Sequence, residues 1–169
     1  MGTEKILVAY ASKRGSAQQA AEWIAEELGD QTDLINLYDQ PSPSLEPYEV
    51  IVLGSGMEAG SVYPPLKKFI KKNEEKLAAK KVCLFITHFA EGEGIEEDFR
   101  TAFSEDFLAK ALVRAGMGGR LELKKVSFLA RPIMKMIAKQ QRVDITNYDN
   151  LSQQSCIDFA RAVRAVCFD

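Results

Sequence analysis

The sequence predicts an α/β fold in which a parallel β-sheet carries helices on both of its faces. Apolar runs of strand length alternate along the chain with amphipathic segments of helix length, as in chains built from β-α-β units. The apolar runs are nearly continuous, which is typical of strands that are covered on both faces. At 169 residues the chain is long enough for a sizeable core, and we expect a single domain over 1–169.

Five segments have the character of strands. They are Lys5–Ala11, Thr32–Leu37, Val50–Leu53, Lys81–Thr87 and Gly119–Val126. The first four are largely apolar, whereas the last alternates apolar and polar residues and is expected at an edge of the sheet.

Helices are predicted between and after these strands, from apolar residues at helical spacing. They are Ser16–Leu28, Pro64 to about Lys72, Glu96 or Phe99 to Ala115, a short helix within 127–141, and Asn150–Val166. Gly29 and Gly116 are expected to end two of them, and proline suits the first turn of the helix that begins at Pro64.

Composition excludes several classes of protein. Lys and Arg number 22 against 24 Asp and Glu, giving a net charge of −2, so the basic excess typical of nucleic-acid binding is absent. The three cysteines have neither C-x-x-C spacing nor an even number, so we expect reduced thiols and no metal site. No apolar run approaches the ~20 residues of a membrane span, and the protein is expected to be cytoplasmic.

The first predicted strand runs directly into a short loop and a helix. The loop contains hydroxyl groups, the basic pair Lys13 and Arg14, and the flexible Gly15. Because free N–H groups and the positive end of the dipole lie at a helix N-terminus, this arrangement favours a bound phosphate. An ordinary strand-to-helix turn with a serine cap remains the alternative.

Two further loops, S-G-M-E-A-G-S-V-Y and T-H-F-A-E-G-E-G, follow the third and fourth predicted strands. In open parallel sheets, ligands bind at the carboxyl ends of the strands, so these small-residue loops are expected to hold a flat group. The chain lacks the G-x-G-x-x-G and G-x-x-x-x-G-K-[ST] motifs of dinucleotide and P-loop sites. It also has Gly54-Ser55 where a phosphoacceptor domain of this topology would carry a carboxylate.

Three stretches resemble the flavodoxin family, and within it the branch close to menaquinone-dependent protoporphyrinogen oxidase. They are Y-A-S-K-R-G-S-A in the first loop, V-L-G-S-G-M-E-A-G at the end of the third strand, and V-S-F-L-A-R-P-I-M-K-M-I late in the chain. The resemblance extends from Lys5 to about Val166 and implies a flavodoxin-like fold with strand order 2-1-3-4-5. It also implies FMN as the cofactor and electron transfer as the activity, with no catalytic residue of the protein itself.

The resemblance also implies which residues surround FMN. Those near the phosphate are Ser12, Lys13, Arg14, Gly15, Ser16 and Ala17. Those near the isoalloxazine ring are Ser55, Gly56, Met57, Glu58, Ala59, Gly60, Thr87, His88 and Phe89. The single histidine, His88, is a candidate proton donor to the flavin, because its unperturbed pKa of about 6.5 suits proton exchange near neutrality.

The chain departs from the family at two of these positions. Ala17 stands where relatives commonly have Thr, and Glu58 stands where they often have a Tyr that stacks on the flavin. These departures leave open a flavodoxin-like binding module without FMN, alongside an electron carrier and an oxidoreductase acting on protoporphyrinogen or a quinone. The expected partner is a redox protein or a small-molecule acceptor. The amphipathic segment 127–141 is either packed against the core or forms a surface for a peripheral membrane or quinone contact.

Overall fold

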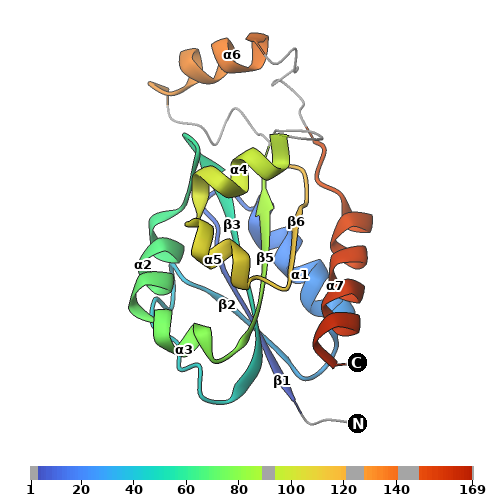
Figure 1. Cartoon of the computed structure of the whole chain (residues 1–169). Coiled ribbons are helices and arrows are strands. Elements are labelled where there is room, and N and C mark those ends of the chain that lie inside the picture. The colour runs from blue at the N-terminus through green and yellow to red at the C-terminus, as the bar shows by residue number, and fades with distance from the viewer. Residues whose placement is uncertain (1–3, 89–93, 121–127, 141–148, 169) are drawn as a thin grey trace.

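A parallel β-sheet forms the centre of the computed structural model (Figure 1), which describes residues 4–88, 94–120, 128–140 and 149–168. Its strands are β1 (Lys5–Ala11), β2 (Thr32–Asn36), β3 (Tyr48–Glu58), β4 (Ser61–Val62), β5 (Lys81–Thr87) and β6 (Val113–Gly116). The parallel strands follow the order β2-β1-β3-β5-β6, while the short β4 pairs antiparallel with the end of β3. With β4 set aside, this is the predicted order 2-1-3-4-5.

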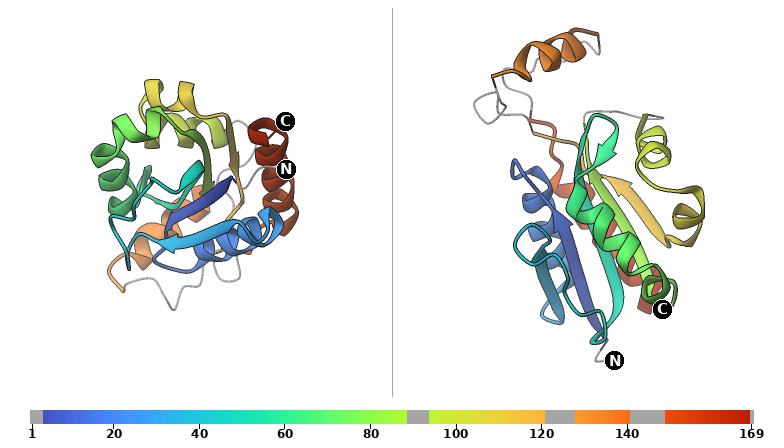
Figure 2. Two further views of the ribbon diagram at one scale, coloured as in Figure 1. Left: turned by 90° about the horizontal axis from the view of Figure 1, so that it is seen from below. Right: turned by 90° about the vertical axis from the view of Figure 1, so that its left-hand side faces the viewer.

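Helices cover both faces of the sheet. They are α1 (Ser16–Leu28), α2 (Pro64–Lys72), α3 (Glu74–Ala78), α4 (Gly94–Ala102), α5 (Glu105–Lys110), α6 (Arg131–Gln140) and α7 (Gln153–Phe168). α1 and α7 lie on one face and α2 to α5 on the other, whereas α6 stands apart, beyond the carboxyl ends of the strands (Figures 1 and 2). None of the helices in the described parts of the chain combines the length and the apolar character that crossing a bilayer requires.

The alternation of side chains along β1 divides the core into two layers. Ile6, Val8 and Tyr10 pack with the buried residues of α1 and α7. Leu7, Ala9 and Ala11 belong to the opposite cluster, which also holds the buried residues of α2 to α5. The central strands are therefore buried on both sides, as their continuous apolar sequences predict.

Gly54 in β3 shows how tightly this core is packed. It lies beside Phe85 of β5 in the register of the sheet. A Cβ atom built at Gly54 would lie 1.9 Å from the Cζ atom of Phe85, whose ring is fully buried. The aromatic ring therefore occupies the space that any side chain at this position would need.

The region predicted as one helix ending at Ala115 is different, and that prediction is wrong. It contains α4, α5 and then β6. The Ser104 side chain caps α5 by accepting a hydrogen bond from Phe107 N–H at 3.2 Å, which starts a new helix where the prediction had a continuous one. Val113–Gly116 then pairs with β5, because pairing at an open sheet edge outweighs a weak local preference for helix.

The fifth strand therefore lies earlier than the predicted Gly119–Val126, of which only residues 119 and 120 are described. Arg120 forms an isolated antiparallel bridge with Asp149, and Asn150 N–H donates to the Gly119 carbonyl at 2.8 Å. Arg120 Nε also lies 3.1 Å from Asp149 Oδ2. We call these paired residues, 119–120 with 149–150, the stem. The chain that contains α6 thus leaves and rejoins the domain at adjacent positions.

Candidate functional site

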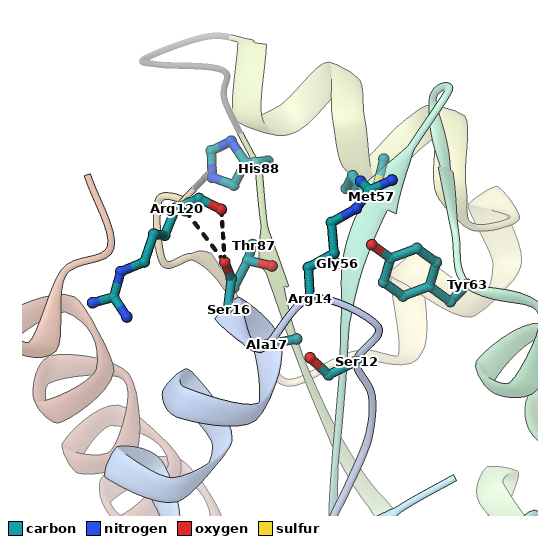
Figure 3. A pocket seen from close by; sticks show the side chains of 11 residues that line it. Ser12, Arg14, Ser16, Ala17, Gly56, Met57, Tyr63, Thr87, His88 and Arg120 are labelled. Atoms are coloured by element: carbon teal, nitrogen blue, oxygen red, sulfur yellow. Dashed lines mark hydrogen bonds between the residues drawn. The ribbon is translucent and has the colours of Figure 1, made fainter. Parts of the chain in front are cut away.

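A cleft opens at the carboxyl ends of β1, β3 and β5, at the predicted edge of the sheet (Figure 3). Its walls come from the loop after β1, the first turn of α1, the end of β3, the start of α2, the end of β5 and the stem. The lining residues are Ser12, Arg14, Ser16, Ala17, Gly56, Met57, Tyr63, Thr87, His88, Gly119 and Arg120.

The loop after β1 presents the N-terminus of α1 to this cleft. Gly15 precedes the helix with φ +94°, a left-handed conformation that glycine adopts without steric cost, and its N–H donates to Ser12 Oγ at 3.2 Å. The helix has no side-chain cap and no acidic residue in its first turn. Its first amides and the positive end of its dipole therefore suit an anionic ligand, as the sequence predicts.

The Ser16 hydroxyl connects α1 to the stem (Figure 3). It donates to the Arg120 carbonyl at 3.0 Å and accepts from Arg120 N–H at 3.3 Å. A serine hydroxyl has a single hydrogen to donate, and here Arg120 takes it. Ser16 thus has a structural role across 104 positions of sequence, in addition to its place in the lining of the cleft.

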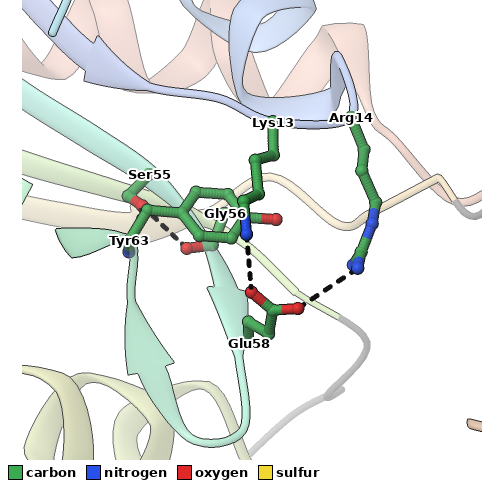
Figure 4. Close-up of polar contacts among 6 residues, drawn as sticks. All are labelled: Lys13, Arg14, Ser55, Gly56, Glu58 and Tyr63. Carbon is green, nitrogen blue, oxygen red and sulfur yellow. Dashed lines mark hydrogen bonds and ion pairs between the residues drawn. The ribbon is translucent and has the colours of Figure 1, made fainter. Parts of the chain in front are cut away.

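Glu58 lies across the cleft from the basic pair of the loop (Figure 4). Its carboxylate accepts from Arg14 Nη2 at 3.2 Å and lies 3.7 Å from Lys13 Nζ. The end of β3 and β4 form a tight hairpin that places Glu58 there, with Ala59 and Gly60 at the tip. Both tip residues have positive φ, as the turn that matches the twist of such hairpins requires. Glu58 therefore neutralises the two cations predicted to meet the phosphate.

Ser55 supports the opposite wall without lining the cleft. Its buried hydroxyl donates to the Gly56 carbonyl at 2.7 Å and accepts from Tyr63 N–H at 3.0 Å. The Tyr63 ring then packs against Gly56, where an added Cβ would lie 2.8 Å from the ring. Lys13 Nζ stands 5.7 Å from the centre of the same ring, and burial raises the pKa of the Tyr63 hydroxyl.

His88 follows β5 and is buried against β6. Its ring fills the space above Gly116, where an added Cβ would lie 2.1 Å from Nε2. Nδ1 lies 3.6 Å from Asp98 Oδ2. Burial, followed by the charge of Glu97, raises the pKa of Asp98. His88 is thus held in place at the cleft by packing and by an acidic neighbour.

The structure brings together eight of the predicted residues as walls of one cleft. They are Ser12, Arg14, Ser16, Ala17, Gly56, Met57, Thr87 and His88. Lys13, Gly15, Ser55, Glu58, Ala59 and Gly60 lie in the same loops without lining the cleft, and Phe89 lies outside the described residues. Tyr63, Gly119 and Arg120 are additional lining residues. The last two follow β6, so a correct placement of the fifth strand would have put them at this edge.

Comparison with known proteins supports the same class of fold. The family model for the Flavodoxin domain matches residues 7–147, and the chain belongs to this family. No curated protein gives a significant match. The chain is similar in structure to oxidised flavodoxin 2 from Bacillus cereus, with 22% identity, TM-score 0.60, and coverage of 95% of this chain and 98% of that one.

Two other solved structures share the fold. A flavodoxin, WrbA-like protein from Agrobacterium tumefaciens has 15% identity and a TM-score of 0.52, with coverage of 96% of this chain and 99% of that one. Rubredoxin oxygen:oxidoreductase from Desulfovibrio gigas has 13% identity and a TM-score of 0.53, and the match covers 98% of this chain but 37% of that longer one. Family membership confirms the predicted flavodoxin resemblance, whereas the narrower branch stays a prediction.

The residues of the cleft fit FMN, the cofactor that this family membership supports. The uncapped, acid-free first turn of α1 and the adjacent Arg14 suit a phosphate. Ala17 contributes only a methyl group to the wall of the cleft, and Met57 and the Tyr63 ring, which covers Gly56, offer apolar and aromatic surface. Glu58 does not line the cleft, but its ion pairs with Lys13 and Arg14 compete with a phosphate for these cations.

Proposed function

We propose that the chain binds FMN non-covalently in the cleft and acts as an electron-transfer flavoprotein. The observation that carries the proposal is the N-terminus of α1, which opens into the cleft without a side-chain cap or acidic residue, beside Arg14. Family membership supports the identity of the ligand. The two core layers share one sheet, which supports a single domain over 1–169.

In this proposal the loop after β1 and the first turn of α1 hold the phosphate, with Lys13 and Arg14 supplying charge. Gly56, Met57, Tyr63, Thr87 and His88 would hold the isoalloxazine ring. The bound cofactor would supply the redox chemistry, and the protein contributes position, exclusion of water and electrostatics. His88 is proposed to hold a proton or a hydrogen bond at the cleft, with Asp98 orienting its Nδ1.

Two glycines with positive φ, one at each end of α1, provide a test and its control. Gly15 and Gly29 both have φ +94°, at opposite ends of α1. Gly15→Ala should cost about 1 to 2 kcal/mol of stability from the left-handed backbone. Gly29→Ala should cost about 1 to 3 kcal/mol, because its ψ of −169° places it in a region that only glycine adopts readily. Only Gly15→Ala should weaken FMN binding, measured by quenching of flavin fluorescence. Equal FMN affinity in the two variants would remove the loop from the proposed site.

An oxidoreductase acting on protoporphyrinogen or a quinone is the second candidate. The position of α6 beyond the carboxyl edge of the sheet (Figure 1) favours it, together with the late stretch that resembles the protoporphyrinogen oxidase branch. Flavin absorbance of freshly purified protein separates both candidates from a module without FMN. Turnover of a porphyrinogen with a quinone then distinguishes the enzyme from a carrier, whose partner would be a redox protein or a small-molecule acceptor.

A further inference from the structure

The segment 128–136 gathers the most exposed large apolar side chains in the described parts of the chain. Leu129 is 85% exposed, Phe128 81%, Ile133 58% and Met136 57%. The other exposed large apolar residues are less exposed, from 38% at Leu34 to 52% at Val166. An apolar cluster of this kind on a surface is typical of an interaction site. It also rules out the simple core packing that the sequence left open for these four side chains.

The same segment is positively charged. Residues 128–140 include Arg131, Lys135 and Lys139 and no acidic residue, in a chain whose net charge is −2. At 3.6 residues per turn, the three basic residues lie along one stripe of α6, and Ile133 and Met136 lie on a stripe roughly 130° around the helix. Lys135 and Lys139 are exposed, as are Ile133 and Met136. α6 is therefore a basic amphipathic helix whose apolar residues Ile133 and Met136 are exposed.

We propose that α6 and the preceding Phe128 and Leu129 dock on an anionic lipid surface. In such contacts the apolar side chains enter the boundary between headgroups and acyl chains, and the basic side chains meet the lipid phosphates. The exposed aromatic and aliphatic residues suit the apolar boundary of the bilayer. The positive charge suits the anionic phosphates. A second copy of the chain is the other occupant, and the experiment separates the two.

The position of α6 gives the docking a direction. α6 lies beyond the carboxyl ends of the strands, at the same edge as the cleft, in each of the side views (Figures 1 and 2). Docking through α6 would therefore turn the mouth of the cleft toward the lipid. If FMN binds as proposed, electrons could then pass to an acceptor dissolved in the bilayer. This consequence rests on the proposed function, whereas the docking itself does not.

Cosedimentation with lipid vesicles tests the docking, using the protein as purified, with and without added FMN. The vesicles consist of phosphatidylcholine alone or of phosphatidylcholine with phosphatidylglycerol as the anionic lipid. The wild type should bind the anionic vesicles and bind the neutral ones far more weakly. Replacing Arg131, Lys135 and Lys139 together by Gln should weaken binding by on the order of a hundredfold, at about fivefold for each charge.

Matched controls exist on other elements. α2 carries four exposed lysines, so replacing Lys67, Lys68 and Lys71 by Gln removes the same charge from a helix without exposed large apolar residues. Ile133→Ser with Met136→Ser tests the apolar contribution, and Leu112→Ser is its control. The α2 and Leu112 variants should bind as the wild type does. Loss of binding in the controls equal to that in the α6 variants would overturn the proposal.

A spectroscopic probe locates the contact. Phe128→Trp in a Trp23→Phe background places the only indole on the segment, and its emission should shift to the blue on anionic vesicles. An unshifted emission from sedimenting protein would place the contact elsewhere and overturn the proposal. So would the absence of vesicle binding, or self-association in lipid-free buffer that Ile133→Ser with Met136→Ser abolishes.

Discussion

Replacing Glu58 by Gln should tighten FMN binding by releasing the cations of the loop after β1. In the structure one carboxylate contacts both Arg14 Nη2, at 3.2 Å, and Lys13 Nζ, at 3.7 Å. A phosphate that uses these cations must compete with Glu58. The substitution keeps the size of the side chain and removes the competing charge.

The magnitude follows from the exposure of the pair. The side chain of Glu58 is 45% exposed, that of Lys13 52% and that of Arg14 22%, so solvent screens the contact with Lys13 and, less fully, the contact with Arg14. Ion pairs of this kind are worth about 0.2 to 1 kcal/mol each. Two of them therefore set the gain at about 0.4 to 2 kcal/mol, or roughly a 2- to 30-fold lower Kd for FMN.

Flavin fluorescence quenching with two ligands gives a clear assay. Riboflavin lacks the phosphate, so its affinity should be the same in the wild type and in Glu58→Gln. The gain for FMN should shrink as salt concentration rises, because salt screens exposed charges. Glu49→Gln, at the opposite end of β3, is exposed and controls for the change in net charge.

Two results would refute the reasoning. Unchanged FMN affinity in Glu58→Gln would mean that Lys13 and Arg14 can contact Glu58 and the phosphate at the same time. An equal gain for riboflavin would place Glu58 against the isoalloxazine ring and not at the phosphate. The resemblance to the flavodoxin family implies that position against the ring.

Three further predictions concern the frame of the site. Gly54→Ala should lower the free energy of unfolding, measured by denaturant titration, by about 1 to 3 kcal/mol through overpacking. Adding Phe85→Leu to that variant should recover part of the loss, because the two positions are in contact. Burial and the hydrogen bond to Asp33 raise the pKa of Tyr48 to about 12 from 10.0; the folded state thus keeps a proton that the unfolded state loses. The free energy of unfolding should therefore fall as pH rises from 10 to about 12. It should fall less steeply in Tyr48→Phe, and equal slopes in the two proteins would argue against the pKa shift. Replacing residues 121–148 by a short glycine linker should preserve a cooperative thermal unfolding transition and FMN binding, because the stem holds both ends of the segment. An unfolded product would contradict this role of the stem.

The central strands and the first helix could be predicted because local and tertiary preferences agree there. Lys5–Ala11, Ser16–Leu28 and Lys81–Thr87 have the predicted bounds. Each strand is a continuous apolar run, and Gly29 ends the helix. The secondary structure after Phe99 was harder to predict. β6 is a strand only because it pairs with β5, and residues Val113 to Ala115 have no strong local preference for a strand.

The site divides in a similar way. Loops at the ends of parallel strands must meet at one edge, so the sequence located the cleft and most of its walls. The pairing of Glu58 with Lys13 and Arg14 depends on the hairpin of β3 and β4, whose Ala59-Gly60 turn lacks the Asn-Gly or Asp-Gly pair that usually marks such a turn. The bond from Ser16 to Arg120 joins distant segments and has no sequence signal.

The stem also has a consequence for how this protein can vary in evolution. Arg120 and Asp149 lie side by side in the stem, so the domain holds both ends of the chain between them. The contacts that hold these ends do not depend on the sequence between them. The entropy of closing a flexible loop grows only with the logarithm of its length, by about 0.6 kcal/mol for each doubling. Insertions and deletions between residues 120 and 149 should therefore be nearly neutral for folding. Selection can then act on that segment for its contacts alone, and related chains should differ in length there more than at any strand of the sheet.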